Sequence, residues 1–245
     1  MKEAHIQLDA SVNAKCAVLP GDPKRVDVIA SLLEDVQPLT FNREYRSVVG
    51  TYKGMRVIAI STGMGGSSTA IAVEELKHIG VNTMVRIGSC GAYQEGIDLG
   101  DLVLVEGAIR EDGASKCYVD SIYPACPDYR LIGKCEEAAK AFGFPYHTGI
   151  ALSHESFYHD ENDRQTEYWR KKGVLGADFE SAALFTVGRL RHVHTASILN
   201  NVVVYGVDSA DAVADYAGGA SKTAEGERRE ALVALEAMYL LQKEL

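Results

Sequence analysis

The chain has 245 residues, of which 47% are hydrophobic, and 34 acidic against 25 basic residues give a formal net charge of −9. This length and apolar content allow a substantial core and exclude a disordered chain, and the absence of a glycine period or of sustained heptads excludes a collagenous or coiled-coil rod. The acidic balance argues against a bulk nucleic-acid binder, so an anionic ligand must be met by a local cluster of arginine or lysine.

Compartment and metal content can be inferred from the N-terminus and the cysteines. The first residues carry no apolar signal core, and no apolar run approaches the roughly 18 residues that a membrane span needs. The five cysteines are odd in number and contain no C-x-x-C pair, which argues against a disulfide framework and a zinc site. We therefore expect a cytoplasmic protein with reduced thiols, no membrane association and no bound metal.

Apolar, β-rich runs alternate with helical patterns along the chain. Strands are expected at residues 16–19, 45–52, 55–61, 83–87, 102–105, 150–152, 177–180 and 195–204, and helices at 70–78, 129–142, 181–190 and 223–245. Residues 63–69 are expected to open a helix from a glycine-rich stretch, and residues 88–91 (GSCG) to form a turn. With no linker or repeat, one domain spanning 1–245 is expected. The alternation predicts an α/β fold on a buried, mixed sheet, with ligands at strand ends.

Three arginines stand beside glycine turns or in strands, namely Arg25, Arg43 and Arg86. Arg86 is the most informative, because a guanidinium inside an apolar strand is costly to bury unless it meets an anion. Planar guanidinium groups hold phosphate through paired hydrogen bonds. The alternative for Arg86 is a structural salt bridge to Glu74 or Glu75.

The glycine-rich residues 63–69 (GMGGSST) precede a helix, where backbone N–H groups and the helix dipole favour an anion. No lysine follows the segment, so it is not a P-loop, and a capped strand-to-helix turn is the alternative.

Asp178 and Glu180 are two residues apart at the end of an expected strand, a spacing that places both carboxylates on one face. Such a pair can accept hydrogen bonds from the vicinal hydroxyls of a sugar or act as an acid/base couple. The alternative is a helix N-terminal charge beside an exposed acid. Phe157 and Tyr158 could stack on a base, although core packing explains them equally well.

Six motifs occur in this order: residues 20–25 (PGDPKR), 42–45 (NREY), 61–66 (STGMGG), 74–76 (EEL), 86–91 (RIGSCG) and 178–181 (DFES). Together with residues 108–113 (AIREDG) they resemble the hexameric nucleoside phosphorylases, a family that includes uridine phosphorylase and the bacterial-type purine nucleoside phosphorylases. The similarity runs from about residue 5 to the C-terminal helix.

The resemblance implies a three-layer α/β/α sandwich around a mixed, distorted β-barrel-like sheet. It implies reversible phosphorolysis, in which phosphate attacks C1′ of a nucleoside and releases the free base and ribose 1-phosphate, with inorganic phosphate as co-substrate and no cofactor. It also implies a homo-oligomer, a hexamer built as a trimer of dimers, whose site is shared across the dimer.

The resemblance also implies roles for individual residues, with Arg86 and Glu180 as the catalytic pair. Phosphate would be held by Gly21, Arg25, Arg86 and Ser89, and by Arg43 of a neighbouring subunit. The ribose would be bound by Asp178, Phe179 and Glu180, and by His5 of the neighbour. The base would lie against Phe157. Apart from the resemblance, Arg164, Gln165 or Asn201 of this chain could serve its polar edge. A phosphate clamped by arginines is placed to stabilise and capture an oxocarbenium-like sugar, so no covalent intermediate is required.

The departures from the family concern the base and the sugar. Purine members carry an aspartate near the end of the late strand, where this chain has Val202, and uridine members carry a Gln-x-Arg pair that residues 157–164 lack in register. Asp178 and Phe179 stand where the family has Glu and Met.

We expect a uridine-type phosphorylase, because the aspartate of purine members is missing and residues 109–115 (IREDGAS) favour that subgroup. Purine nucleoside phosphorylase is the close alternative. A related nucleosidase would have less need of Arg25, Arg43 and Arg86, and a non-catalytic nucleoside-binding relative is a further alternative.

Overall fold

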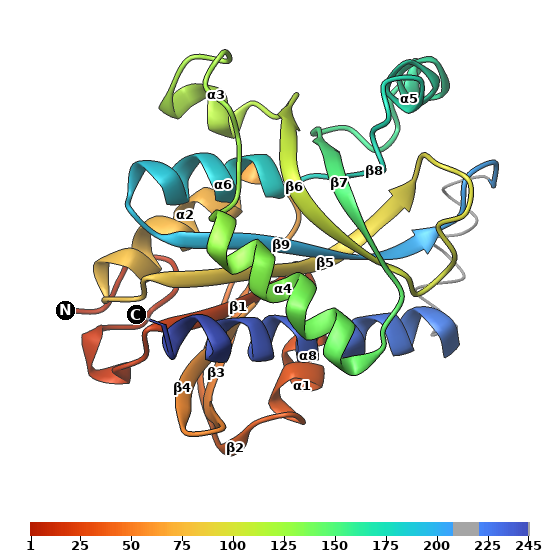
Figure 1. The fold of residues 1–245 in the computed structure, drawn as a ribbon. Coiled ribbons are helices and arrows are strands. Elements are labelled where there is room, and N and C mark those ends of the chain that lie inside the picture. The colour runs from red at the N-terminus through yellow and green to blue at the C-terminus, as the bar shows by residue number, and fades with distance from the viewer. Residues whose placement is uncertain (208–220, 245) are drawn as a thin grey trace.

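A computed structural model of the chain describes residues 1–207 and 221–244. Its strands form a nine-stranded sheet in the order β2-β3-β4-β1-β5-β8-β7-β6-β9 (Figure 1). The strands are β1 (Cys16–Pro20), β2 (Glu34–Asn42), β3 (Tyr45–Tyr52), β4 (Met55–Ile60), β5 (Thr83–Ala92), β6 (Leu102–Arg110), β7 (Tyr146–Ser153), β8 (Gly176–Asp178) and β9 (His194–Val203).

The last five strands of this order close into a barrel because β5 also pairs with β9. The β5–β9, β6–β7 and β7–β8 pairs are parallel, and β5–β8 and β6–β9 are antiparallel. Beside the barrel, β1 lies parallel to β4 and β5, and β2, β3 and β4 continue as an antiparallel meander. Strand β5 therefore belongs to both the barrel and the open part of the sheet.

The helices are α1 (Arg25–Ala30), α2 (Gly66–His78), α3 (Ala114–Tyr118), α4 (Tyr129–Phe142), α5 (Asn162–Arg170), α6 (Ser181–Leu190) and α8 (Ser221–Gln242), with a 3₁₀ turn at Ala10–Val12. Figure 1 shows α2, α3 and α6 on one side of the sheet and α1, α4 and α8 on the other, with α5 standing apart at one end. The molecule thus has three layers.

Alternate side chains of the central strands pack into two separate hydrophobic cores, one on each face of the sheet. Along β1, Ala17 and Leu19 join the core on the α2 and α6 side, whereas Cys16 and Val18 join the core on the α1, α4 and α8 side. A strand that is buried on both faces is apolar throughout, which is why this segment could be recognised in the sequence.

The turn expected at residues 88–91 is wrong, because β5 continues through them to Ala92. They pair with β9 on one side, and Gly91 pairs with β8 on the other. Glycine is needed at residue 88 for space rather than for a turn, since a Cβ there would lie 2.3 Å from Nη2 of Arg86.

The sequence pattern also omitted strand β2, although most other elements lie close to their predicted positions. Strand β2 is largely exposed, contains Pro38 and has two register irregularities against β3, which are features of an edge strand. The helices predicted at 129–142 and 181–190 are confirmed as α4 and α6. The helix predicted at 223–245 is α8, and its predicted last residue, Leu245, lies outside the described residues.

Across residues 1–207 and 221–244, no helix combines the length and apolarity needed to cross a bilayer. The five cysteines are free thiols, and Cys16, Cys90 and Cys135 are buried. Burial raises the pKa of Cys16 to about 11, so this thiol stays protonated and unreactive.

Candidate active site

Arg86 lies in the middle of β5, between Leu19 of β1 and Ser197 of β9, and only 4% of it is exposed. Its Nε donates a 2.9 Å hydrogen bond to Asp178, and its Nη2 lies 2.5 Å from a carboxylate oxygen of Glu180. Burial alone would lower the pKa of Arg86, but the two carboxylates outweigh burial and raise the pKa. Within the described residues, Nη1 has no hydrogen-bond partner. A buried guanidinium N–H without a partner marks a place for an anion.

The salt bridge from Arg86 to Glu74 or Glu75 is not formed. Glu74 lies 2.8 Å from the guanidinium of Arg191, and Glu75 lies 2.6 Å from Nδ1 of His5. Both acids of helix α2 thus have other partners. The charge of Arg86 is instead balanced by Asp178 and Glu180, which the sequence analysis paired as candidates for sugar binding or acid/base chemistry.

Asp178 has a mainly architectural role. Its Oδ2 accepts hydrogen bonds from the Ser181 backbone N–H at 3.0 Å and the Ser181 hydroxyl at 2.6 Å, besides the one from Arg86, and its Oδ1 accepts one from Ser153 at 2.6 Å. Asp178 therefore fixes the start of α6 and the direction of Arg86. The side chain of Asp178 is fully buried, so a sugar hydroxyl could reach it only if this packing opened.

Glu180 ties three segments together at the N-terminus of α6. Its Oε1 accepts a 2.6 Å hydrogen bond from the backbone N–H of Gly65, and its Oε2 faces Arg86 and the backbone N–H of Phe179 at 3.2 Å. Burial raises the pKa of Glu180, although Arg86 and these N–H groups oppose the shift. The anion that the glycine-rich segment was expected to meet is therefore, in this structure, a carboxylate of the protein itself.

Arg25 begins helix α1 and is 5% exposed. Its Nε donates to Glu227 at 2.9 Å and its Nη1 to Glu230 at 3.3 Å, both on α8. Glu230 also accepts a 3.1 Å hydrogen bond from the backbone N–H of Gly88. The carboxyl group of Glu230 thus connects the start of α1 with strand β5.

Gly21 lies on the segment between β1 and α1, next to Nη1 of Arg86. A Cβ built on Gly21 would lie 3.9 Å from Nη1 of Arg86. Ser89 is partly buried on β5, directly after Gly88. Four of the five residues predicted to bind phosphate, Gly21, Arg25, Arg86 and Ser89, are therefore carried by the β1–α1 segment and strand β5.

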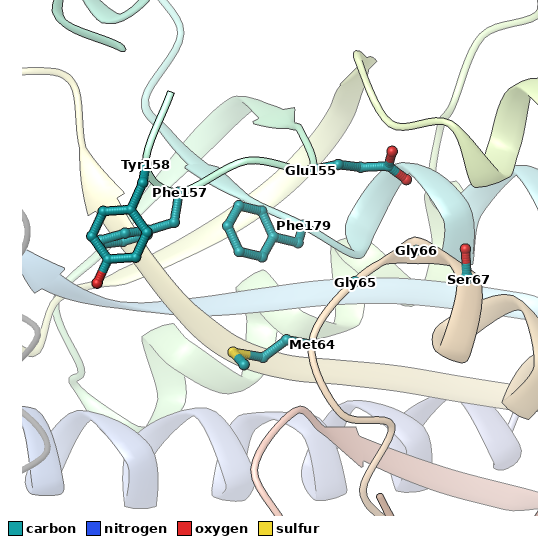
Figure 2. A pocket seen from close by; sticks show the side chains of 8 residues that line it. All are labelled: Met64, Gly65, Gly66, Ser67, Glu155, Phe157, Tyr158 and Phe179. Atoms are coloured by element: carbon teal, nitrogen blue, oxygen red, sulfur yellow. The ribbon is translucent and has the colours of Figure 1, made fainter. Parts of the chain in front are cut away.

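A pocket of about 650 Å³ opens beside these charges and is lined by Met64, Gly65, Gly66, Ser67, Glu155, Phe157, Tyr158 and Phe179 (Figure 2). Figure 2 shows Phe157 and Tyr158 at one end, Phe179 in the middle, and Glu155 with Ser67 at the other end. Gly65 and Phe179 each donate a backbone N–H to Glu180, so the pocket adjoins the buried carboxylate. Its lining is mostly apolar, which suits a flat ring next to a sugar.

Two predicted residues lie on the surface of the chain, away from this pocket. Arg43 is exposed in the two-residue connection between β2 and β3, where its φ is 54°. His5 has a side chain that is 40% exposed, and its Nδ1 contacts Glu75. Neither residue joins the site within one chain, and both were predicted to act in a neighbouring subunit.

The candidates for the polar edge of the base are not brought to the pocket. Arg164 is exposed on α5 and pairs with Glu161, and together with Gln165 it lines a separate cavity of about 260 Å³. Asn201 is fully buried, its Nδ2 donates to the carbonyls of Ile97 and Asp98, and its Oδ1 accepts from the backbone N–H groups of Ala92 and Val203. No donor or acceptor of Asn201 remains for a ligand.

The sequence analysis did not identify Glu227 and Glu230 as partners of Arg25. For Glu230, the sequence contains a feature that could have indicated such a role. Residues 230, 234, 237, 238 and 241 are buried and repeat at helical spacing, so Glu230 stands on the apolar stripe of α8. An acid at such a position is costly unless it has partners, and therefore indicates a buried polar network.

No group of three or more His, Cys, Asp or Glu side chains suited to a metal ion occurs in residues 1–207 and 221–244. The described site offers two buried arginines, buried carboxylates and an adjoining apolar pocket. A buried guanidinium whose Nη1 has no partner among the described residues, next to a carboxylate and an apolar pocket, fits an enzyme that brings an oxyanion to a sugar.

The chain belongs to the phosphorylase superfamily, whose family model matches residues 15–233. It is 38% identical to uridine phosphorylase of Thermococcus kodakarensis over 97% of this chain and 86% of that protein. It is also 38% identical to guanosine phosphorylase of Halorubrum lacusprofundi over 80% of this chain and 81% of that protein. A solved structure of uridine phosphorylase from Vibrio fischeri ES114 matches with a TM-score of 0.91 and 44% identity, covering 98% of each chain.

These findings confirm the resemblance that was drawn from the motifs, and with it the expected α/β fold and the enzyme class, a nucleoside phosphorylase of the pentosyltransferase type. The family implies a nucleoside and phosphate as substrates.

Proposed function

We propose that this protein catalyses the reversible phosphorolysis of uridine to uracil and ribose 1-phosphate. The observation that carries the proposal is the buried Nη1 of Arg86, which has no partner in the described residues and lies beside Gly21. Uridine is chosen because relatives that are 38% and 44% identical over nearly the whole chain are named uridine phosphorylases.

Phosphate is bound where Arg86, Arg25 and Gly21 meet. One phosphate oxygen takes the N–H of Arg86 that has no partner in residues 1–207 and 221–244, because a buried charged donor gains most from an anionic acceptor. Ser89 on β5 offers a further hydroxyl, and Arg43 of a neighbouring subunit completes the charge.

Glu180 binds the ribose 2′- and 3′-hydroxyls, and Phe179 packs under the sugar. Because Arg86 lies 2.5 Å from Glu180, one guanidinium links the sugar carboxylate to the phosphate. As the bond from C1′ to the base breaks, positive charge develops on the sugar, and the bound phosphate stabilises this charge and then captures C1′. The base leaves with the electron pair of the broken bond and gains the proton that monohydrogen phosphate loses, so no covalent bond to the enzyme forms.

The base lies in the pocket against Phe157, which forms an edge-to-face pair with Tyr158 at a centroid distance of 4.9 Å. Arg164 and Asn201 are left out of this proposal, since one lines a different cavity and the other has no free hydrogen-bonding group. A purine is the second candidate, because a guanosine phosphorylase is 38% identical over 80% of the chain.

We further propose that residues 1–245 act as one domain in a cytoplasmic, dimer-based hexamer. The exposed Arg43 and the half-exposed His5 support a shared site, because they suit a role in an adjoining subunit. The arginines argue against the nucleosidase alternative, which would use water in place of phosphate.

The test is base release from uridine, thymidine, inosine, guanosine and adenosine, followed by chromatography with and without phosphate. We expect uridine to be cleaved fastest and only with phosphate. Equal rates without phosphate would establish a nucleosidase, and faster cleavage of guanosine would establish the purine alternative. Nucleoside binding without turnover would identify a non-catalytic relative.

A further inference from the structure

We propose that Glu230 is a positioning residue of the phosphate site, which in its neutral form holds Arg25 and strand β5 in place and on ionisation weakens phosphate binding. The inference rests on the proposed phosphorolysis and adds a residue, from the C-terminal helix, that touches neither substrate.

The geometry of Glu230 joins two parts of the phosphate site. One carboxyl oxygen accepts from Nη1 of Arg25 at 3.3 Å, and the other accepts from the backbone N–H of Gly88 at 3.1 Å. Gly88 lies two residues after Arg86 on β5 and directly before Ser89. Glu230 therefore fixes the direction of Arg25 relative to the strand that carries Arg86.

The charges around Glu230 make its protonation state important. Two guanidinium groups, those of Arg25 and Arg86, are surrounded by four carboxyl groups. With all four carboxyl groups ionised, the cluster would already be negative before a phosphate dianion entered, and buried excess charge is strongly unfavourable. A neutral Glu230 removes one negative charge where the ligand would add two.

The surroundings of Glu230 favour the neutral form near pH 7. In the described part of the chain, the titratable and charged groups that face it are Arg25 from α1, Arg86 and Cys90 from β5, and Glu227 one turn earlier on α8. Complete burial, assisted by Glu227, raises the pKa of Glu230 to about 8, although Arg25, Arg86 and the Gly88 N–H oppose the shift. The shorter hydrogen bond of Arg25, 2.9 Å, goes to Glu227 instead.

Ionisation of Glu230 would change what Arg25 offers to a ligand. A charged carboxylate competes for the guanidinium with phosphate, whereas a neutral carboxyl group offers it only an uncharged oxygen and carries an O–H of its own. Phosphate affinity should therefore fall as the pH rises through about 8.

The experiment measures the phosphate KM and kcat at saturating uridine from pH 6 to 9.5, for the parent protein, Glu230→Gln and Glu230→Ala. Glutamine is neutral at every pH and keeps one acceptor oxygen, with an amide N–H group in place of the O–H of the acid. We expect the ratio of parent to Glu230→Gln phosphate KM to be near 1 at pH 6.5 and to rise about 10-fold by pH 9.5. The ratio cancels the ionisation of phosphate itself. Glu230→Ala should raise the phosphate KM about 10-fold at pH 7 with a smaller change in kcat, and glutamine should rescue it.

Glu236→Gln is the matched control, because Glu236 lies on the same helix and contacts Tyr52 and Lys53 instead of the site. Its phosphate KM should follow the parent at each pH. A ratio that stays flat with pH, or a phosphate KM unchanged in Glu230→Ala, would overturn the inference. If Glu230→Ala does not fold, the pH dependence of the parent-to-Glu230→Gln ratio of phosphate KM is sufficient to support or overturn the inference.

Failure of the proposed function gives a different result, namely no phosphate-dependent turnover in the parent protein. In that case the same comparison is made by calorimetric titration with inorganic phosphate at pH 6.5 and 9.5. A parent-to-Glu230→Gln ratio of dissociation constants that rises about 10-fold supports the inference, and a flat ratio or no phosphate binding overturns it.

Discussion

Arg86 and Arg110 are both buried arginines on barrel strands, yet their surroundings differ in kind. Arg110 ends β6 and uses all five N–H groups, donating to the Ser115 hydroxyl and to the carbonyls of Ser115, Val119, Asp120 and Tyr123. Arg86 meets two carboxylates and keeps Nη1 without a partner in the described residues.

The difference separates an arginine that builds the fold from one that binds a ligand. Carbonyl and hydroxyl groups satisfy Arg110 completely, so the loop after β6 is wrapped around it. Arg86 is left incomplete in a site where an anion can complete it. Burial alone, which is 8% exposure for Arg110 and 4% for Arg86, would not distinguish the two.

The largest expected effect is at Arg86. Arg86→Ala removes the charge and the unused N–H, and should lower kcat/KM for phosphate about 100- to 1,000-fold. Arg86→Lys is the matched variant, which keeps the charge but loses the planar fork and should recover only part of the activity. Steady-state kinetics with varied phosphate measure both, and an unchanged phosphate KM and kcat in Arg86→Ala would place the anion site elsewhere.

The opposite pattern is expected at Arg110. Arg110→Ala leaves four carbonyl groups without their donor and should lower the free energy of unfolding by about 2–4 kcal/mol, while the phosphate KM stays within about two-fold. Urea unfolding and the same kinetic assay measure the two quantities. A large loss of phosphate affinity without loss of stability would break the comparison.

A smaller effect is expected from crowding Arg86 instead of removing it. A Cβ at residue 88 would lie 2.3 Å from Nη2 of Arg86, so Gly88→Ala should displace the guanidinium and lower kcat/KM for phosphate about 10- to 100-fold. Gly91→Ala is the control on the same strand, because its Cβ would meet Val203 at an ordinary 3.5 Å. Equal effects of the two substitutions would mean that the strand, and not Arg86, had been disturbed.

The two arginines also predict a difference in how stability responds to pH. The partners of Arg110 are carbonyls and a hydroxyl and do not titrate, whereas the network of Arg25 and Arg86 includes Glu230, whose pKa is raised to about 8. Between the unfolded pKa and 8 the folded state holds a proton that the unfolded state has lost, so this group lowers stability as the pH rises. Glu230→Gln should therefore become more stable relative to the parent as the pH is raised from 5 to 9 in chemical unfolding experiments. A constant difference over that range would contradict the assignment.

Much of the fold could be predicted because the central strands are apolar on both faces and several helices have clear periodicity and caps. Asp128, for example, accepts from the backbone N–H groups that start α4, and Gly143 ends that helix with a φ of 69°. Strand β2 could not be predicted, because an exposed edge strand with a proline has no apolar pattern.

The candidate site was predicted in part for the same kind of reason. Arg86 could be recognised because it stands in an apolar strand, and Asp178 and Glu180 because they form a closely spaced pair of acids. The contact of Arg86 with these two acids could not be predicted, because it joins residues 92 or more positions apart. Sequence spacing cannot decide among distant acids, so Glu74 and Glu75 were weighed as partners. The role of Gly88 was misjudged because a glycine needed for space is indistinguishable in sequence from a glycine needed for a turn.

Strand β5 pairs with β1, β8 and β9, so the backbone under Arg86 is held from both sides. Its amide protons should exchange with solvent only when the whole molecule opens. The pocket wall, in contrast, is supplied largely by residues 64–67 and 155–158 in the stretches that enter α2 and precede α5. Directed evolution toward another nucleobase can therefore begin in these two short stretches and spare Gly65, whose N–H holds Glu180.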